Sequence, residues 1–186
     1  ANAVTGGTTL PAGAMGYFSP STAIVTFDTC ANYAPITVDG STIGGDLKVG
    51  GLVGHYGGGS NLKVINGYTN AGEINIAPKS VAASKSVQIG GMIGNFSASF
   101  STESTGRLHN KGNITYSGAS SSGSTVRIAG ILAAMAKNPP TDLELVNTGN
   151  LTSTGTGKTV NVGGILGAGK SVENAICYCS IKAVNV

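Results

Sequence analysis

A tandem repeat is the feature that most limits how this chain can fold. Four copies of an apolar segment built around a pair of small residues occur at Leu47 to Gly54, Val87 to Gly94, Val126 to Ala133 and Val160 to Gly167. With a weaker copy near the N-terminus, the second small residue of each pair gives the landmarks Gly13, Gly51, Gly91, Gly130 and Gly164. By subtraction these landmarks lie 38, 40, 39 and 34 residues apart. Periods of this size are typical of solenoids, propellers and other repeat arrays.

A second motif keeps step with the first. Asn-x-Gly occurs at Asn70, Asn110 and Asn147, and a degenerate copy starts at Asn32. A short stretch of alternating apolar and polar residues follows each copy, which is the period of a strand with one buried face. Because Asn and Gly tolerate positive φ, we expect each Asn-x-Gly to form a tight turn.

The glycine pair interrupts the alternation of the first motif. Leu47 and Val49 flank Lys48, whereas Leu52, after the two glycines, falls on the opposite phase. We therefore predict a glycine bend or bulge at which the chain turns a corner. Equivalent residues of successive repeats should stack in columns, with apolar side chains inside one sheet-walled tube and polar ones outside.

Composition excludes two other architectures. Charged residues make up 10% of the chain and glycine 30 of 186 residues, which argues against a charged linker and against a helix bundle. We predict an all-β parallel β-solenoid of about five repeats of ~38 residues, forming a single domain over residues 1–186. The segments rich in Ser, Gly and Lys are predicted loops: residues 39–46, 77–86, 117–125 and 153–159 on one edge, and 55–61, 95–105 and 136–142 on another. The terminal copies are atypical, as capping turns are.

The two motifs together resemble the GLUG repeat, whose pattern is roughly Gly-Gly-Leu-Val-Gly followed by an apolar position, Asn and a turn ending in Gly. The resemblance covers about Pro11 to Val184. It departs in the first copy, at Ala34 and Pro35, and in the last, where Cys177-Tyr-Cys179 stands instead of Asn-x-Gly. Such repeats occur in large secreted and surface proteins of Bacteroidetes and other bacteria. The resemblance implies a β-helical scaffold in an adhesin-like or surface-anchored protein, and no shared catalytic residues.

Several partners are disfavoured by the sequence. The net charge of +3 comes from basic residues scattered singly, which opposes nucleic-acid binding. No apolar stretch reaches the length of a transmembrane helix, so we expect a soluble chain whose export signal has already been removed. Cys30, Cys177 and Cys179 lack the spacing of a metal site, and we expect neither a metal nor a cofactor.

Two motifs have the form of catalytic signatures. Gly164 to Ser171 fits the phosphate-binding pattern G-x-x-x-x-G-K-S, but its first half is a copy of the repeat, so we interpret the match as a coincidence. His55 and His109 are the only histidines, and no Gly-x-Ser-x-Gly elbow accompanies them. We interpret both as solvated loop residues, although a Ser-His-Asp triad is not excluded by spacing.

Acidic residues bear on a possible hydrolase or lyase. Only two pairs could meet in the predicted stack, Asp39 with Asp46 and Glu144 with Glu173. Glycosidic chemistry requires converging carboxylates, or acids with Arg or Lys, on neighbouring turns. Because each repeat places its acids differently, we expect no catalysis and name no catalytic residue.

Three further features concern surface recognition. Aromatic rings near the predicted loops could stack on sugars, namely Tyr17, Phe18, Tyr56, Phe96 and Phe100, although about half of them should be core residues. An ice-binding threonine ladder is disfavoured because the expected column is interrupted: Thr37, Asn75, Thr115, Thr152 and Lys182. The N-glycosylation pattern occurs at Asn95, Asn113 and Asn150.

These observations lead to one functional expectation and one alternative. We expect a non-enzymatic extracellular or cell-surface module with a structural or adhesive role, which contacts glycans or a host matrix and self-associates through its solenoid ends into a fibre. Exposed end strands with unpaired edges motivate the self-association. The alternative is a β-helical polysaccharide lyase or glycoside hydrolase.

Overall fold

The structure is a computed structural model that describes residues 12–19, 24–59, 61–169, 176–179 and 184–185. This part of the chain consists of strands joined by turns and contains no helix. Within the same ranges no helix long and apolar enough to cross a membrane is found.

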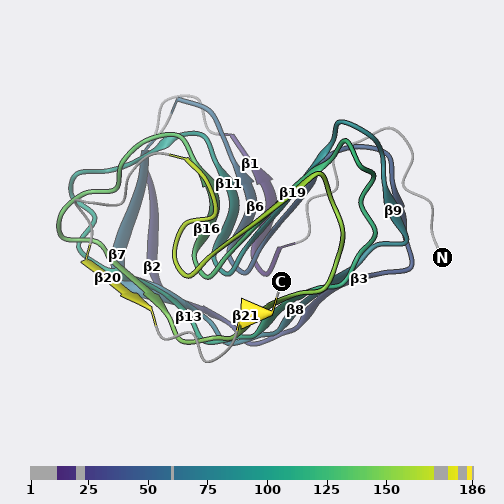
Figure 1. Ribbon diagram of the computed structural model, residues 1–186. Helices are drawn as coiled ribbons and strands as arrows, with labels where there is room; N and C mark the ends of the chain where they lie inside the picture. The colour runs from purple at the N-terminus through teal and green to yellow at the C-terminus, as the bar shows by residue number, and fades with distance from the viewer. Residues whose placement is uncertain (1–11, 20–23, 60, 170–175, 180–183, 186) are drawn as a thin grey trace.

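Successive repeats lie one above the next, which confirms the predicted parallel β-solenoid (Figure 1). The landmark glycines form a column, because the α-carbon of each faces the carbonyl oxygen of the next landmark along the chain. Five stacked landmarks enclose four intervals, so the stack has about four turns where we expected about five.

Four sheets of parallel strands form the main walls of the stack (Figure 1). Two of them lie toward the middle of the molecule and two lie on its outside. One inner wall contains β5 (Leu47–Gly50), β10 (Ser86–Gly90), β15 (Thr125–Ala129) and β19 (Thr159–Gly163). The other inner wall contains β1 (Met15–Phe18), β6 (Val53–Tyr56), β11 (Ile93–Phe96) and β16 (Leu132–Met135). The first outer wall contains β2 (Val25–Asn32), β7 (Asn61–Asn70), β12 (Ser99–Phe100), β13 (Arg107–Asn110), β17 (Glu144–Asn147) and β20 (Ile176–Cys179). The second outer wall contains β3 (Ile36–Asp39), β8 (Ile74–Ala77), β14 (Ile114–Tyr116), β18 (Leu151–Ser153) and β21 (Val184–Asn185).

The cross-section has two lobes rather than the single tube that we expected. Figure 1 shows them side by side, with the inner walls meeting the outer walls near the centre. One lobe, here called the aromatic lobe, encloses a core that includes Tyr56, Phe96 and Phe100 between β6, β11 and β7. The other, the aliphatic lobe, encloses a separate core dominated by Ile, Val and Leu, such as Leu47 and Ile76.

The glycine pair explains both the corner and the change of phase. Leu47 and Val49 point into the aliphatic core, whereas Leu52 points into the aromatic core, so the alternation shifts because the chain passes from one core to the other. The predicted glycine bend is therefore confirmed. A methyl group on Gly91 would overlap with the Gly130 carbonyl and with the side chain of Asn110, so only glycine lets the walls approach this closely.

A column of buried asparagines lies against the glycine corners. The amide Nδ2 of each residue donates to the Oδ1 of the next: Asn32 to Asn70 at 2.8 Å, Asn70 to Asn110 at 2.9 Å and Asn110 to Asn147 at 2.8 Å. Each Nδ2 also donates to the carbonyl two residues later, as Asn110 does to Gly112 at 2.9 Å. We call this column the asparagine ladder. Its amides are satisfied by one another and by the turns that follow them.

The expectation of positive φ in the Asn-x-Gly turns is wrong. Neither these asparagines nor Gly72, Gly112 and Gly149 adopt positive φ. Glycine is required there by close approach, since a side chain on Gly112 would overlap with the backbone of Gly72 in the turn before it. In this motif the asparagine forms one rung of the ladder and the glycine allows close contact between turns. The motif does not form a left-handed turn.

Two sets of predicted loops are more regular than expected. In residues 39–46 and 77–86, β4 (Thr42–Ile43) pairs with β9 (Ser80–Val81). The column continues through single bridges from Val81 to Ser120 and from Ala119 to Thr156. On the other edge, residues 95–105 contain β12. The tip of the aliphatic lobe is therefore a fifth, narrow wall.

We predict that Asn110→Ala destabilises the fold by about 2–4 kcal/mol. The substitution leaves an N–H of Asn70, the Oδ1 of Asn147 and the Gly112 carbonyl without their buried partners. Urea unfolding measures the free energy. The control is Asn75→Ala on β8, where the side chain is half-exposed and donates to Glu73, and a loss below about 0.5 kcal/mol is expected there. Equal losses in the two variants would contradict a stabilising ladder.

Candidate functional site

A broad hollow lies on the outer wall of the aromatic lobe. It has a volume of about 550 Å³, and we call it the basin. The residues that give it chemical character are Tyr33, Asn66, Arg107, His109 and Lys111. They come from three successive turns and are brought together by strand register, since β2 and β13 both pair with β7.

An irregularity in the strands creates the basin. The register of β2 against β7 shifts between Asp28 and Cys30, where one residue of β2 stands opposite two of β7. Thr29, Asn66 and Gly67 have φ of 47°, 58° and 126° at this bulge. The Asn66 amide donates to the Asp28 carboxylate at 2.8 Å, and this bond holds the pKa of Asp28 below its ordinary value. Bulges commonly bend strands and redirect side chains in this way.

The basin carries the positive charge of Lys111 and a guanidinium that is paired with a carboxylate. Arg107 and Lys111 are exposed, and no carboxylate is among the residues that line the hollow. Arg107 Nε donates to Glu144 at 2.5 Å, which fixes the guanidinium beside the opening. Burial, followed by the charges of Lys111 and Arg107, lowers the pKa of His109, so this imidazole is neutral at pH 7.

Tyr68 lies beneath the basin as a hydrogen-bond donor. Its hydroxyl donates to the Gly51 carbonyl at 3.3 Å, which joins the basin floor to the glycine corner. Burial raises the pKa of Tyr68 to about 12, with a smaller contribution from Cys30. The phenol therefore stays protonated at neutral pH and is unsuited to act as a general base.

The outward faces of the two inner walls meet at an angle, and we call the line along which they meet the notch. Outward-facing side chains of the two walls meet across it. Lys48 Nζ lies 3.2 Å from His55 Nδ1, and Asn95 Nδ2 donates to Gln88 Oε1 at 2.9 Å in the next turn. In the following turn a hollow of about 220 Å³ lies in the notch beside Arg127.

Both histidines are in strands, not in loops as we expected. His55 is in β6 and His109 in β13, and each is partly buried with its ring on the outer face. His55 Nε2 lies 3.3 Å from Ser97 Oγ, and His109 Nε2 lies 3.1 Å from Thr148 Oγ1. In a Ser-His-Asp triad the other ring nitrogen contacts a carboxylate, but His55 Nδ1 contacts the Lys48 ammonium instead. This geometry is not that of an activated serine.

The apparent phosphate-binding loop is part of the repeat where the structure describes it. Gly164 stacks on Gly130, and the chain beyond it bridges β16 through Leu166 and Gly169. Lys170 and Ser171, which would contact phosphate, lie outside the described residues. A phosphate-binding loop instead leaves its strand and leads into a helix.

The acid pairs are not assembled into a described site. Asp46 accepts hydrogen bonds from the backbone N–H and hydroxyl of Ser86 at 2.9 and 3.1 Å, which gives it a role between turns. Asp39 is exposed at the end of β3, and Glu173 lies outside the described residues. Glu144 is the one acid among the residues lining the three described hollows, and it is paired with Arg107.

Most of the aromatic candidates belong to the core. Tyr56, Phe96 and Phe100 are buried, and Phe18 packs against them. The four rings form a ladder with centroid distances of 5.5, 5.3 and 4.4 Å in the order Phe18, Tyr56, Phe96, Phe100. Only Tyr17 of the five is exposed, with its ring packed on His55. The exposed ring in the basin, Tyr33, was not among our candidates.

The remaining surface candidates are placed as follows. The column of Thr37, Asn75, Thr115 and Thr152 forms as expected, but its fifth member is Asn185 rather than Lys182, which lies outside the described residues. Asn95 is in the notch. Asn113 and Asn150 stack at one repeat position, and the backbone N–H of Asn150 donates to Asn113 Oδ1 at 3.1 Å.

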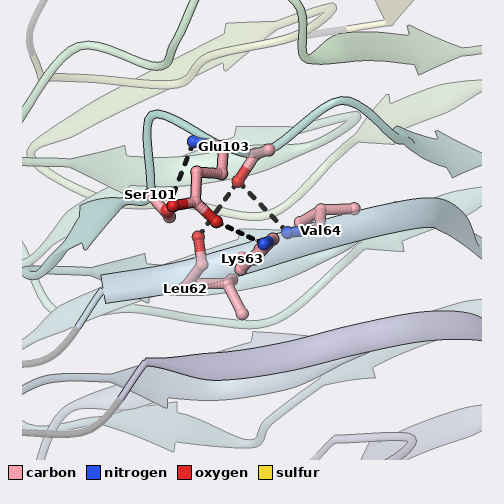
Figure 2. A network of polar contacts seen from close by, with 6 residues as sticks. Leu62, Lys63, Val64, Ser101 and Glu103 are labelled. Atoms are coloured by element: carbon pink, nitrogen blue, oxygen red, sulfur yellow. Dashed lines mark hydrogen bonds and ion pairs between the residues drawn. The ribbon is translucent and has the colours of Figure 1, made fainter.

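A polar network closes a gap in the outer wall of the aromatic lobe (Figure 2). Between β12 and β13 the chain leaves the sheet, and the buried Ser104 hydroxyl replaces the missing strand. It accepts from the Val64 N–H at 3.1 Å and donates to the Leu62 carbonyl at 3.2 Å. Outside it, Lys63 forms an ion pair with Glu103, which lowers the pKa of Glu103. The network keeps β7 covered next to the basin.

No cluster of metal-ligating side chains is found in the described part of the chain. Cys30 and Cys179 are free, exposed thiols, and Cys30 lines the basin. The side chain of Cys177 lies outside the described residues.

Comparisons with protein-family models, with curated proteins and with solved structures found no match in any of the three. The function must therefore be inferred from the geometry of the chain itself.

Sequence reasoning missed both concave surfaces. It predicted an outward column for Lys48 and its equivalents, which are Gln88 and Arg127, but did not pair that column with His55, Asn95 and Ala134. Counting four residues beyond the second small residue of each repeat would have identified the second column. The basin had no comparable signal, because it depends on a bulge and on the register of three turns.

We predict that the free energy of unfolding falls as the pH drops below about 6.5. Burial lowers the pKa of His55; the charge of Lys48 lowers it further, and Asp46 opposes the change. Burial also lowers the pKa of His109. The unfolded chain therefore takes up protons at a higher pH than the folded chain. The stability that the neutral imidazoles contribute above about pH 6.5 is lost as the pH falls toward the pKa values of the folded state.

Urea unfolding between about pH 7 and pH 5 measures this effect. The test variants are His55→Asn, which copies Asn95 of the next turn, and His109→Thr, which copies Thr69 of the preceding one. Each should reduce the dependence, and the double variant should nearly abolish it over this range. An unchanged pH dependence in the double variant would refute the assignment.

Proposed function

We propose that this chain is a structural and adhesive module of an extracellular or cell-surface protein, and that it binds acidic glycans in the basin. The stack suits a scaffold because every turn is joined to the next by sheet hydrogen bonds and by the asparagine ladder. Such a body is stiff and presents its outward side chains at fixed spacing. The resemblance to GLUG repeats supports the extracellular setting.

The composition of the basin carries the proposal. Tyr33 is 76% exposed and offers a ring face on which a sugar can stack. Lys111 contributes a positive charge, Arg107 contributes a guanidinium that is paired with Glu144, and Asn66 contributes an amide that also donates to Asp28. An apolar ring face beside amide and cationic donors fits a saccharide that carries carboxylate or sulfate groups.

The alternative, a polysaccharide lyase or glycoside hydrolase, has weaker support. A hydrolase needs two converging carboxyl groups, and the described hollows offer only Glu144, which is held by Arg107. A lyase needs a base in the cationic basin. His109 is neutral there, but it already contacts Thr148, and Tyr68 is a protonated donor. We therefore propose binding without turnover.

We predict that Tyr33→Ala weakens binding to an acidic glycan by roughly fivefold to tenfold, through loss of ring stacking. A glycan array that contains uronate and sulfated sugars first identifies the ligand, and calorimetry measures its dissociation constant. The matched control is Tyr17→Ala, which removes another exposed tyrosine outside the basin. An array without acidic-glycan ligands, or equal effects of the two variants, would contradict the proposal. Release of reducing ends or of shortened sugars from the same ligands would favour the enzyme.

We further propose that copies of the chain associate end to end. Among the described strands β3 is at the end of its sheet and is paired only with β8, so its other edge can accept another strand. Sedimentation of the whole chain should show a mass that rises with concentration. A lysine on an edge strand opposes such pairing, so Thr37→Lys should reduce it, whereas Thr115→Lys in the middle of the stack should not. Monomers at all concentrations would rule the association out.

A further inference from the structure

The notch changes its chemistry from turn to turn. In two successive turns the inner walls are joined across it by polar pairs seven residues apart, Lys48 with His55 and Gln88 with Asn95. In the next turn Arg127 occupies the register position of Gln88, and Ala134 occupies that of Asn95. A methyl group cannot accept a hydrogen bond. Arg127 is therefore an outward residue without a polar counterpart across the notch, and it carries a charge.

The missing polar counterpart leaves both space and an unmet donor. The hollow of about 220 Å³ opens between Arg127 and Ala134, and its lining also includes Asn95, Ser97, Met135 and Ala168. The Nε of Arg127 is buried and forms no hydrogen bond. An unpaired buried N–H is costly, and more so on a charged group. No carboxylate is among the residues that line the hollow.

We propose that this hollow is a binding site for the carboxylate group of a small ligand. A guanidinium matches a carboxylate in a planar, two-bond geometry, and the terminal Nη groups offer this edge because Nε is enclosed by protein atoms. Asn95 and Ser97 supply polar groups on one side, and Ala134, Met135 and Ala168 supply an apolar side for the carbon skeleton. Two sources of such a carboxylate fit, a uronic acid sugar and an acidic amino acid. The site is separate from the basin and does not depend on the role proposed for it.

The chain provides a direct readout. It has two arginines, Arg107 and Arg127, and the Nε–H signal of each can be followed by nitrogen-15 NMR. The Arg107 signal reports separately on ligand bound in the basin, where its Nε donates to Glu144. We expect D-glucuronate or N-acetylaspartate to shift the Arg127 signal in a saturable way, and D-glucose to leave it in place. The tighter of the two carboxylates identifies the source. Absence of a saturable shift with both carboxylates, or an equal shift with glucose, would overturn the proposal.

Two variants separate a binding site from a merely structural arginine. Ala134→Asn restores the pairing seen in the preceding turn, fills the hollow and keeps Arg127, so carboxylate affinity should fall at least tenfold while the melting temperature is kept or raised. Arg127→Gln copies Gln88 and should abolish binding, and it serves as the test if Ala134→Asn does not fold. Undiminished binding by Ala134→Asn or by Arg127→Gln would refute the site.

Discussion

The contact between the glycine corners and the asparagine ladder is the constraint on which the rest of the structure depends. Because the second glycine of each pair has no side chain, the inner walls reach the outer walls at the centre and divide the interior into two cores. The asparagines occupy the line of contact, where an apolar side chain would leave the carbonyls of the following turns without donors. The same residues thus set the shape of the cross-section and satisfy its buried polar groups.

The ladder also fixes the register of every wall. An asparagine amide can bond to the next amide only when equivalent residues are directly above one another, as in other stacked amide columns. The ladder ends where the repeat departs from its pattern. At the last rung Asn147 Nδ2 faces Cys179 Sγ at 4.0 Å, and at the first Asn32 donates to the Ala34 carbonyl. The irregular copies that the sequence suggested as caps therefore include the two ends of the hydrogen-bonded column.

The sequence was sufficient for the period, the parallel stacking, the glycine corner and the inward and outward faces, because these follow from the identity of residues that recur. It was insufficient for the two-lobed cross-section. The change of phase between Val49 and Leu52 indicates a corner, but it does not show that the chain enters a second hydrophobic core beyond that corner. The role of Asn70 was misjudged because Asn-x-Gly has a familiar local use in turns, whereas its use here is a contact between turns. Tyr33 and Asn66 line the same hollow beside the bulge in β2 and β7, and such a bulge leaves no periodic pattern in the sequence.

Outward side chains of a parallel stack arrive in rows about 4.8 Å apart and point in the same direction, so on a flat wall they do not converge on a ligand. Side chains can converge on a ligand only where the wall bends or meets another wall, so that a hollow forms between them. The described surface provides this at the bulge that forms the basin and at the angle between the inner walls that forms the notch. Because the inward residues and the ladder keep the stack in register, side chains at these two places can differ between turns without disturbing the core. The difference between Asn95 and Ala134 is of this kind, and through it a repeated scaffold acquires a hollow beside Arg127.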